Sequence, residues 1–337
     1  MHEALRYTNI GNKAVQCSLC NHRCTIADGK HGICGVRENR GGILYATTYG
    51  LVSAESVDPI EKKPLYHYLP GTLSYSLGGI GCNFRCEHCQ NWHISQADRT
   101  SARLFPLSPE EGVARALASG SASISWTYNE PTIWHEYTLD MGTLARSRGL
   151  GTCYVTNGYI TEEALRELSP MLAAFRVDLK AFTDEFYKKV CGAHLQPVLD
   201  AAALARELGM HIETVTLVIP GLNDSMEEQE ALIRWVIEHL GPETPMHFSA
   251  FHPDYRMTDR GATPVALLEK ICSRAKELGL RFPYLGNVPH SRYENTYCPA
   301  CGAMLIERRG FASRVVGLDD RQCSTCGEKI EIVRHAG

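Results

Sequence analysis

The chain has 337 residues, a formal net charge of −4, 44% hydrophobic and 21% charged residues, the balance of an ordinary globular protein. No block of basic residues marks a surface for nucleic acid, so we expect no such partner. We also expect a cytoplasmic protein with no membrane partner, because no long apolar run and no signal-peptide core are present.

Three segments follow one another along the chain. Residues 1–70 are rich in cysteine and glycine and predict an irregular N-terminal segment with short strands near 42–48 and 51–52. Residues 71–290 alternate short β-type runs with helical segments, and residues 291–337 form a small Cys-rich module. The predicted strands of the middle segment lie at 73–78, 123–128, 152–156, 175–180, 211–219 and 246–251.

Helix boundaries between these strands carry local signals. Ser108 and Ser225 are predicted N-caps, and Thr263 with Pro264 opens a third helix. Six strand–helix units predict a parallel sheet with right-handed crossovers, as a doubly wound open sheet or a partial (β/α) barrel. In both architectures the functional side chains gather at the carboxyl ends of the strands. Glycines predict the helix ends at Gly120, Gly149, Gly209 and Gly279.

Fourteen cysteines are the most informative feature of the composition. Close spacing of thiols is what a metal site needs, since several sulfurs must reach one ion or cluster from a tight loop. Cys153, Cys191 and Cys272 stand alone and are expected to pack in the core. The other eleven form three groups: Cys17, Cys20, Cys24 and Cys34; Cys82, Cys86 and Cys89; and Cys298, Cys301, Cys323 and Cys326.

The central group follows the first strand of the alternating region. Its spacing is C-x3-C-x2-C, from Cys82 through Cys86 to Cys89. Three thiolates can hold three irons of a [4Fe–4S] cluster and leave the fourth iron open for a ligand. The alternative is a structural zinc loop that His88 or His93 completes.

This pattern resembles the radical S-adenosylmethionine (SAM) superfamily. The run Cys82-Asn-Phe-Arg-Cys86-Glu-His-Cys89-Gln-Asn91 is similar to the branch that includes activating enzymes of glycyl radical enzymes. Further motifs resemble the "AmmeMemoRadiSam system" radical SAM enzymes, and among them are Gly32-Ile-Cys-Gly-Val-Arg37 and Gly286-Asn-Val-Pro289. The resemblance implies a partial (β/α)6 TIM-like barrel, a [4Fe–4S] cluster and SAM as cofactors.

The resemblance also implies roles for residues at the strand ends. His88 stands where the family usually has an aromatic residue that packs on adenine. The family pattern places Tyr128, Asn129 and Glu130 at the SAM amino group, Asn157 at its ribose or carboxylate, Asp178 and Lys180 at SAM, and Ile219 at its adenine. His252, together with Lys180, is the catalytic candidate.

Each of these assignments has a structural alternative. The Tyr128–Glu130 motif can be a helix entry before Pro131. Asp178 and Lys180 can be an internal ion pair, and His252 can be a loop histidine without a special role.

The two flanking cysteine groups predict further metal sites. Cys298, Cys301, Cys323 and Cys326 form two C-x2-C-G knuckles 21 residues apart, which indicates a zinc ribbon, with rubredoxin-like iron as the alternative. Cys17, Cys20, Cys24 and Cys34 suit zinc or a second cluster, and we expect zinc there.

The sequence therefore predicts a radical SAM enzyme that cleaves SAM to a 5′-deoxyadenosyl radical and removes hydrogen from an unidentified small molecule or protein. Two alternatives stay open: an activating enzyme that installs a glycyl radical on a partner protein, and a non-catalytic zinc-binding interaction protein. An electron donor such as flavodoxin or ferredoxin is the expected partner.

Overall fold

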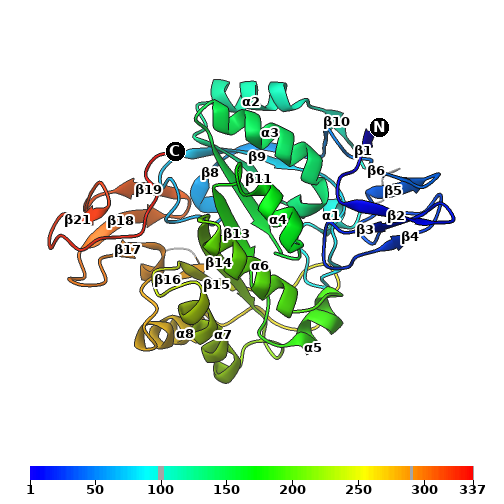
Figure 1. Cartoon of the computed structure of the whole chain (residues 1–337). Helices are drawn as coiled ribbons and strands as arrows, with labels where there is room; N and C mark the ends of the chain where they lie inside the picture. Colours follow the sequence, from blue (N-terminus) through cyan, green and yellow to red (C-terminus); the bar gives the residue numbers. More distant parts are fainter. Residues whose placement is uncertain (98–101, 289–290, 337) are drawn as a thin grey trace.

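A mixed eight-stranded sheet forms the centre of the molecule (Figure 1). The computed structural model describes residues 1–97, 102–288 and 291–336. The strands lie in the order β16-β15-β14-β13-β12-β11-β9-β8. Seven are parallel, and β8 pairs antiparallel with β9 at one edge. Their bounds are β8 (Ala54–Pro59), β9 (Leu73–Gly78), β11 (Ser123–Trp126), β12 (Gly151–Thr156), β13 (Ala174–Asp178), β14 (His211–Val218), β15 (Met246–Ala250) and β16 (Pro283–Gly286).

The six predicted strands are all present, and β16 adds a seventh parallel strand that the sequence did not predict. The parallel strands are buried almost throughout, because helices connect each to the next and cover the sheet. The strand order follows the chain order without the reversal that a doubly wound sheet has, so the architecture is the predicted partial barrel. The helices are α1 (Trp92–Ser95), α2 (Pro109–Ala118), α3 (His135–Ser147), α4 (Glu162–Leu168), α5 (Asp184–Phe186), α6 (Gln196–Glu207), α7 (Met226–His239) and α8 (Val265–Glu277).

The helix boundaries follow the local signals in the sequence. Ser108 and Ser225 accept hydrogen bonds from the backbone N–H groups of Glu111 and Glu228, as N-caps do. The four predicted glycines at the helix ends all have positive φ. Glu228 does not bond back to its own cap; instead it accepts from the N–H of Phe182, so it ties α7 to the end of β13.

The N-terminal segment forms two small antiparallel sheets beside α1 and the cysteine loop that follows β9 (Figure 1). One sheet has the order β2-β3-β4 and the other β1-β6-β5. Arg37 of β5 and Glu136 of α3, each 2% exposed, form a buried ion pair that fixes this segment to the barrel. The strands of these two sheets are β1 (His2–Glu3), β2 (Tyr7–Gly11), β3 (Ala14–Cys17), β4 (Thr25–Ile26), β5 (Arg37–Arg40) and β6 (Ile43–Ala46). A separate two-stranded sheet pairs β7 (Leu51–Val52) with β10 (Phe105–Pro106).

The C-terminal module lies at the opposite side of the molecule, beyond β16 (Figure 1). Arg308 joins it to the barrel: its guanidinium donates to the carbonyl of Tyr66 and lies 4.0 Å from the centre of that ring. Backbone bonds between His67, Leu69 and Val333 add a second attachment. Its strands are β17 (Thr296–Tyr297), β18 (Met304–Arg309), β19 (Ala312–Val315), β20 (Leu318–Asp319) and β21 (Gln322–Cys323).

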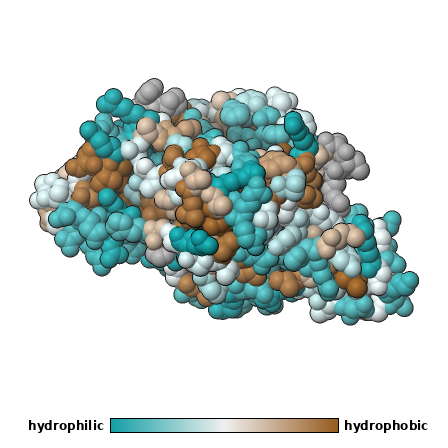
Figure 2. All heavy atoms as spheres, turned by 90° about the horizontal axis from the view of Figure 1, so that it is seen from above, coloured by the Kyte–Doolittle hydropathy of each residue, from teal (hydrophilic) through white to brown (hydrophobic). Residues whose placement is uncertain are grey.

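Apolar surface is divided into separate patches on the face that Figure 2 shows, with hydrophilic residues between them. Within residues 1–97, 102–288 and 291–336, no helix has the length and apolar character that crossing a membrane requires.

Glu213 organises the amino end of β14. The carboxylate is fully buried, accepts hydrogen bonds from the N–H groups of Tyr66 and His67, and lies 2.9 Å from Nε2 of His211 and 2.8 Å from Nε2 of His247. Burial opposes ionisation of Glu213, but the two histidines outweigh it and hold its pKa well below the usual range. The carboxylate thus connects the segment before β9 to β14 and β15.

We predict that Glu213→Ala lowers the free energy of unfolding by about 3–5 kcal/mol, because four donors lose their buried acceptor. Chemical denaturation followed by circular dichroism measures the change. Glu238→Ala, on the exposed face of α7, is the matched control and should shift stability by less than about 0.5 kcal/mol. Equal effects of the two substitutions would contradict the role of Glu213.

Candidate active site at the carboxyl ends of the strands

A cavity of about 560 Å³ opens at the carboxyl ends of the parallel strands. This is where a parallel α/β architecture places functional groups. Ten of the twelve predicted residues of the central site line it: Cys82, Cys86, His88, Cys89, Tyr128, Asn129, Glu130, Asn157, Asp178 and Lys180. The sequence did not predict that Lys62, Lys63, Thr156, Arg176, Leu217, Ser249 and Asn287 also line it.

Side chains from two neighbouring strand ends hold the cysteine loop. Asn129, after β11, accepts from the N–H of Gly79 and donates to the carbonyl of Gly81, both at 3.0 Å. Asn157, after β12, donates to Oδ1 of Asn83 at 2.7 Å. The loop therefore has a fixed course immediately before and after Cys82.

Glu130 holds Asn157, and through it the cysteine loop, in place. Its carboxylate is 2% exposed and accepts hydrogen bonds from the Thr132 N–H, the Thr156 hydroxyl and the Asn157 N–H. Burial raises the pKa of Glu130, although these three donors act in the opposite direction. Glu130 is the N-cap of the helical turn at Pro131, as the structural alternative expected, and it also lines the cavity; its contact with the SAM amino group stays a prediction.

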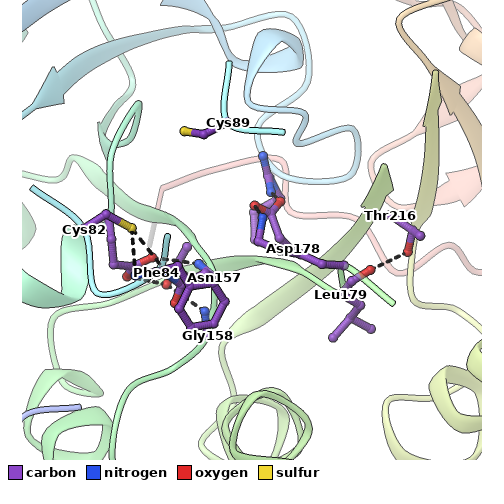
Figure 3. A network of polar contacts seen from close by, with 12 residues as sticks. Cys82, Phe84, Cys89, Asn157, Gly158, Asp178, Leu179 and Thr216 are labelled. Carbon is purple, nitrogen blue, oxygen red and sulfur yellow. Dashed lines mark hydrogen bonds and ion pairs between the residues drawn. The ribbon is translucent and has the colours of Figure 1, made fainter. Parts of the chain in front are cut away.

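The sulfurs of Cys82 and Cys89 face one space beside Asp178 (Figure 3). Cys82 Sγ accepts from the N–H of Phe84 at 3.3 Å and from Nδ2 of Asn157 at 3.8 Å, and Cys89 Sγ lies 3.1 Å from the hydroxyl of Ser95. Hydrogen bonds of this kind stabilise thiolate ligands of a cluster.

The three sulfurs are too widely spaced for a single ion. In the described part of the chain, only the C-terminal cysteines bring three or more metal-binding atoms within 4.8 Å of one another. The donor set and its spacing fit a [4Fe–4S] cluster, in which each thiolate binds a different iron. They give no support to the zinc loop with His88 or His93.

Cys191 is a neighbour of this group that the sequence analysis assigned to the core. It ends the short helical segment Tyr187–Cys191, whose backbone carbonyls accept from the N–H groups of Arg85 and Glu87. A hydrogen bond from the Cys191 thiol lowers the pKa of Cys86 in spite of its burial. Cys191 is buried, as expected, and it packs directly behind a predicted cluster ligand.

The end of β13 carries alternating charges on one face. Asp178 pairs with Lys180 Nζ at 3.0 Å and with the guanidinium of Arg176 on its other side. Burial opposes ionisation of Asp178, but Arg176 and Lys180 outweigh it and lower its pKa. The predicted pair of Asp178 and Lys180 is therefore present, and Arg176 makes it a cation–anion–cation row along the cavity wall.

Tyr128 and Lys63 form the facing wall. The Tyr128 hydroxyl donates to Asp58 at 2.6 Å, and Lys63 bonds the same carboxylate at 2.7 Å. Tyr128 has a φ of 73°, a left-handed conformation that is uncommon for an aromatic residue. Neither Lys62 nor Lys63 carried a sequence signal, because both lie at the end of a short 3-10 helix, Ile60–Lys62, outside the regular strand–helix pattern.

Two predicted residues do not line the cavity. Ile219 is buried just after β14, where Val215 and Leu217 of the strand face the cavity instead. His252 is exposed, and its Nε2 lies 3.0 Å from Nε2 of Gln90, which does line the cavity. The roles proposed for Ile219 and His252 stay predictions, and Pro289 of the motif 286–289 lies outside the described residues.

The C-terminal cysteines form a compact tetrad. Cys298 and Cys326 have sulfurs 3.6 Å apart, and those of Cys301 and Cys323 are 3.7 Å apart. With Zn–S bonds of about 2.3 Å, four sulfurs at tetrahedral corners lie about 3.8 Å apart. The group is thus compatible with a zinc ribbon.

Comparisons with known proteins show the family to which the chain belongs. The family model described as "Radical SAM superfamily" matches residues 77–236. The uncharacterized protein MJ0808 of Methanocaldococcus jannaschii is 45% identical over 335 residues, which cover 99% of this chain and 100% of that protein. The pyruvate formate-lyase-activating enzyme of Clostridium pasteurianum is 22% identical over 59% of this chain and 88% of its own length.

The fold also matches solved structures. A crystal structure of a radical SAM methyltransferase from Sphaerobacter thermophilus aligns with a TM-score of 0.50 and 16% identity, over 70% of this chain and 71% of that chain. At this identity the match concerns the fold alone.

We predict that Cys323→Ala removes about one zinc ion per chain and unfolds the C-terminal module, because a structural zinc contributes folding free energy directly. Elemental analysis and limited proteolysis of residues 291–337 measure both effects. Cys272→Ala, a buried cysteine of α8 outside the ribbon, is the control and should keep the zinc. Unchanged zinc content in Cys323→Ala would disprove the ribbon assignment.

Proposed function

Because the chain belongs to the radical SAM superfamily, whose members bind SAM and form a radical, we propose that it is an enzyme whose reactive [4Fe–4S] cluster binds to Cys82, Cys86 and Cys89. We propose further that the radical removes a hydrogen atom from an unidentified substrate. The observation that carries this proposal is the convergence of three widely spaced thiols and seven further predicted site residues on one cavity at the strand ends.

When bound there, the cluster supplies the electron that breaks the C–S bond of SAM, which yields methionine and a 5′-deoxyadenosyl radical. The residues of the chain position SAM and exclude water. Asn129 and Asn157 keep the cysteine loop in place, and the buried Glu130 keeps Asn157 in place. These three residues thereby fix the distance between the loop and the rest of the cavity.

His88 is suited to contact the adenine or the amino acid part of SAM. Its ring is 5% exposed, lines the cavity, and has an Nδ1 atom without a hydrogen-bond partner in the described structure. Burial lowers the pKa of His88 to about 3, so the ring is neutral at physiological pH. A neutral, partly unsatisfied imidazole can stack on a base and still form one hydrogen bond to the ligand.

The charged row of β13 supplies the polar recognition. Lys180 and Arg176 can bind a carboxylate or a hydroxyl of the ligand, while Asp178 between them keeps both cations in position. Asp178 also offsets one of the two positive charges, so the wall presents cations together with an anion and can meet a ligand that has both negative and positive groups. SAM has this combination in its methionine part.

An activating enzyme that acts on a partner protein is the second candidate. The similarity to the pyruvate formate-lyase-activating enzyme of Clostridium pasteurianum, over 88% of its length, favours it. Electron paramagnetic resonance on a co-expressed candidate partner distinguishes the two: a glycyl radical in the partner supports activation, and turnover of a small metabolite alone supports the first candidate. In both cases, we propose a flavodoxin- or ferredoxin-type protein as the electron donor.

We predict that Cys86→Ala abolishes formation of 5′-deoxyadenosine from SAM under anaerobic, reducing conditions, because two thiolates do not hold the reactive cluster. Liquid chromatography with mass spectrometry measures the product. Cys272→Ala should retain the activity. Product formation at the wild-type rate in Cys86→Ala would overturn the proposed function.

We predict that Asp178→Asn weakens SAM binding about tenfold, equivalent to about 1.4 kcal/mol, because Arg176 and Lys180 lose the anion that orients them. Equilibrium dialysis of SAM against the reconstituted protein measures the affinity. Asp200→Asn, an exposed position on α6, is the matched control. Equal affinity of wild type and Asp178→Asn would show that the row does not contact SAM.

A further inference from the structure

The four N-terminal cysteines meet around a second, separate cavity. Cys17 ends β3, Cys20 and Cys24 lie in the turn before β4, and Cys34 lies in the loop before β5. All four line one cavity together with Arg37. The sequence spacing left zinc and an iron–sulfur cluster open for this group, and the arrangement of the side chains now distinguishes them.

The spacing of the sulfurs separates the metal sites of this chain into two kinds. At the ribbon, the sulfurs lie close enough for a single tetrahedral ion. No three of the N-terminal thiols lie within 4.8 Å of one another, and the same is true of Cys82, Cys86 and Cys89. The N-terminal thiols therefore have the wide spacing of the central thiols and not the close spacing of the ribbon thiols.

Arg37 provides an independent sign of a ligand. Its side chain is 2% exposed and lines the cavity, and its terminal nitrogens bond Glu136 and the carbonyl of Leu5. Its Nε has no hydrogen-bond partner in the described part of the chain. A buried N–H donor without a partner is costly, and a sulfide or thiolate of a bound cluster would satisfy it.

The remaining walls are apolar. Gly32 and the side chains of Leu19, Ile26, Ile33 and Ile133 complete the lining, and an apolar shell of this kind limits the access of water to a cluster. The cavity measures about 10 Å³, so the four sulfurs closely surround the space that an occupant would fill. A tetrahedral zinc ion needs sulfurs about 3.8 Å apart, whereas a cluster holds each sulfur on a different iron and so keeps them farther apart. The N-terminal sulfurs already have the wider spacing.

We propose that Cys17, Cys20, Cys24 and Cys34 bind a second [4Fe–4S] cluster, with the Nε of Arg37 as a hydrogen-bond donor to it. This cluster has four protein ligands and no open iron, so it does not bind SAM. The proposal concerns the metal at these four cysteines, and only the total iron count and the response to SAM rest on the proposed function.

The test is a metal count on the full chain, reconstituted anaerobically and freed of loosely bound iron. We expect about eight irons, about eight sulfides and about one zinc per chain. About four irons with two zinc ions would overturn the proposal, and so would about four irons with one zinc ion if the triple variant at Cys82, Cys86 and Cys89 loses them.

Variants assign the irons to their sites. The triple substitution Cys82→Ala, Cys86→Ala, Cys89→Ala should retain about four irons with the Mössbauer signature of a [4Fe–4S] cluster. The double substitution Cys20→Ser, Cys34→Ser should lose about four irons and keep SAM-dependent changes in the spectrum of the other cluster. A triple variant without iron would contradict the proposal, and the wild-type count decides the question if either variant fails to fold.

Discussion

The hydrogen bonds that Glu130 accepts are the constraint on which the proposed site depends. A buried carboxylate is unfavourable unless donors surround it, and here the donors are the Thr132 N–H and the groups at the end of β12. Through Asn157 and Asn83, this fixes the loop that bears Cys82. The end of β12 thereby positions the cysteine loop that follows β9.

This chain of contacts explains why the polar residues follow β11 and β12 so closely. Parallel strands end at the same edge of the sheet, so short side chains such as Asn129 and Asn157 can span from one strand end to the next loop. A site built from strand ends is also rigid, because each strand is buried on both faces. The amino end of the sheet carries the stabilising network of Glu213, which leaves the carboxyl end free for chemistry.

Much of the fold could be predicted because local signals and hydrophobic patterns agree along residues 71–290. The strand β16 was missed since its four residues, Pro283–Gly286, form too short a run, and β8 was missed because its partly exposed edge lacks an apolar pattern. Arg176 of the site was missed because a single charged residue within an apolar strand gives no signal of function in the sequence. Cys191 lies about a hundred residues from the cysteine that it contacts, so only the folded chain reveals that contact.

The N-terminal segment also shapes the central site directly, whatever metal it holds. Gly81, next to Cys82, has a φ of 83°, and a Cβ atom there would lie 2.5 Å from the carbonyl oxygen of Cys34. His22 Nε2 lies 2.7 Å from the carbonyl of Asn83, and the Arg85 guanidinium bonds the carbonyl of Ile33. The backbone of the N-terminal cysteine segment therefore packs directly against the loop that carries Cys82, Cys86 and Cys89. A metal or cluster bound to the four N-terminal cysteines would therefore act on a segment that directly contacts the Cys82 loop.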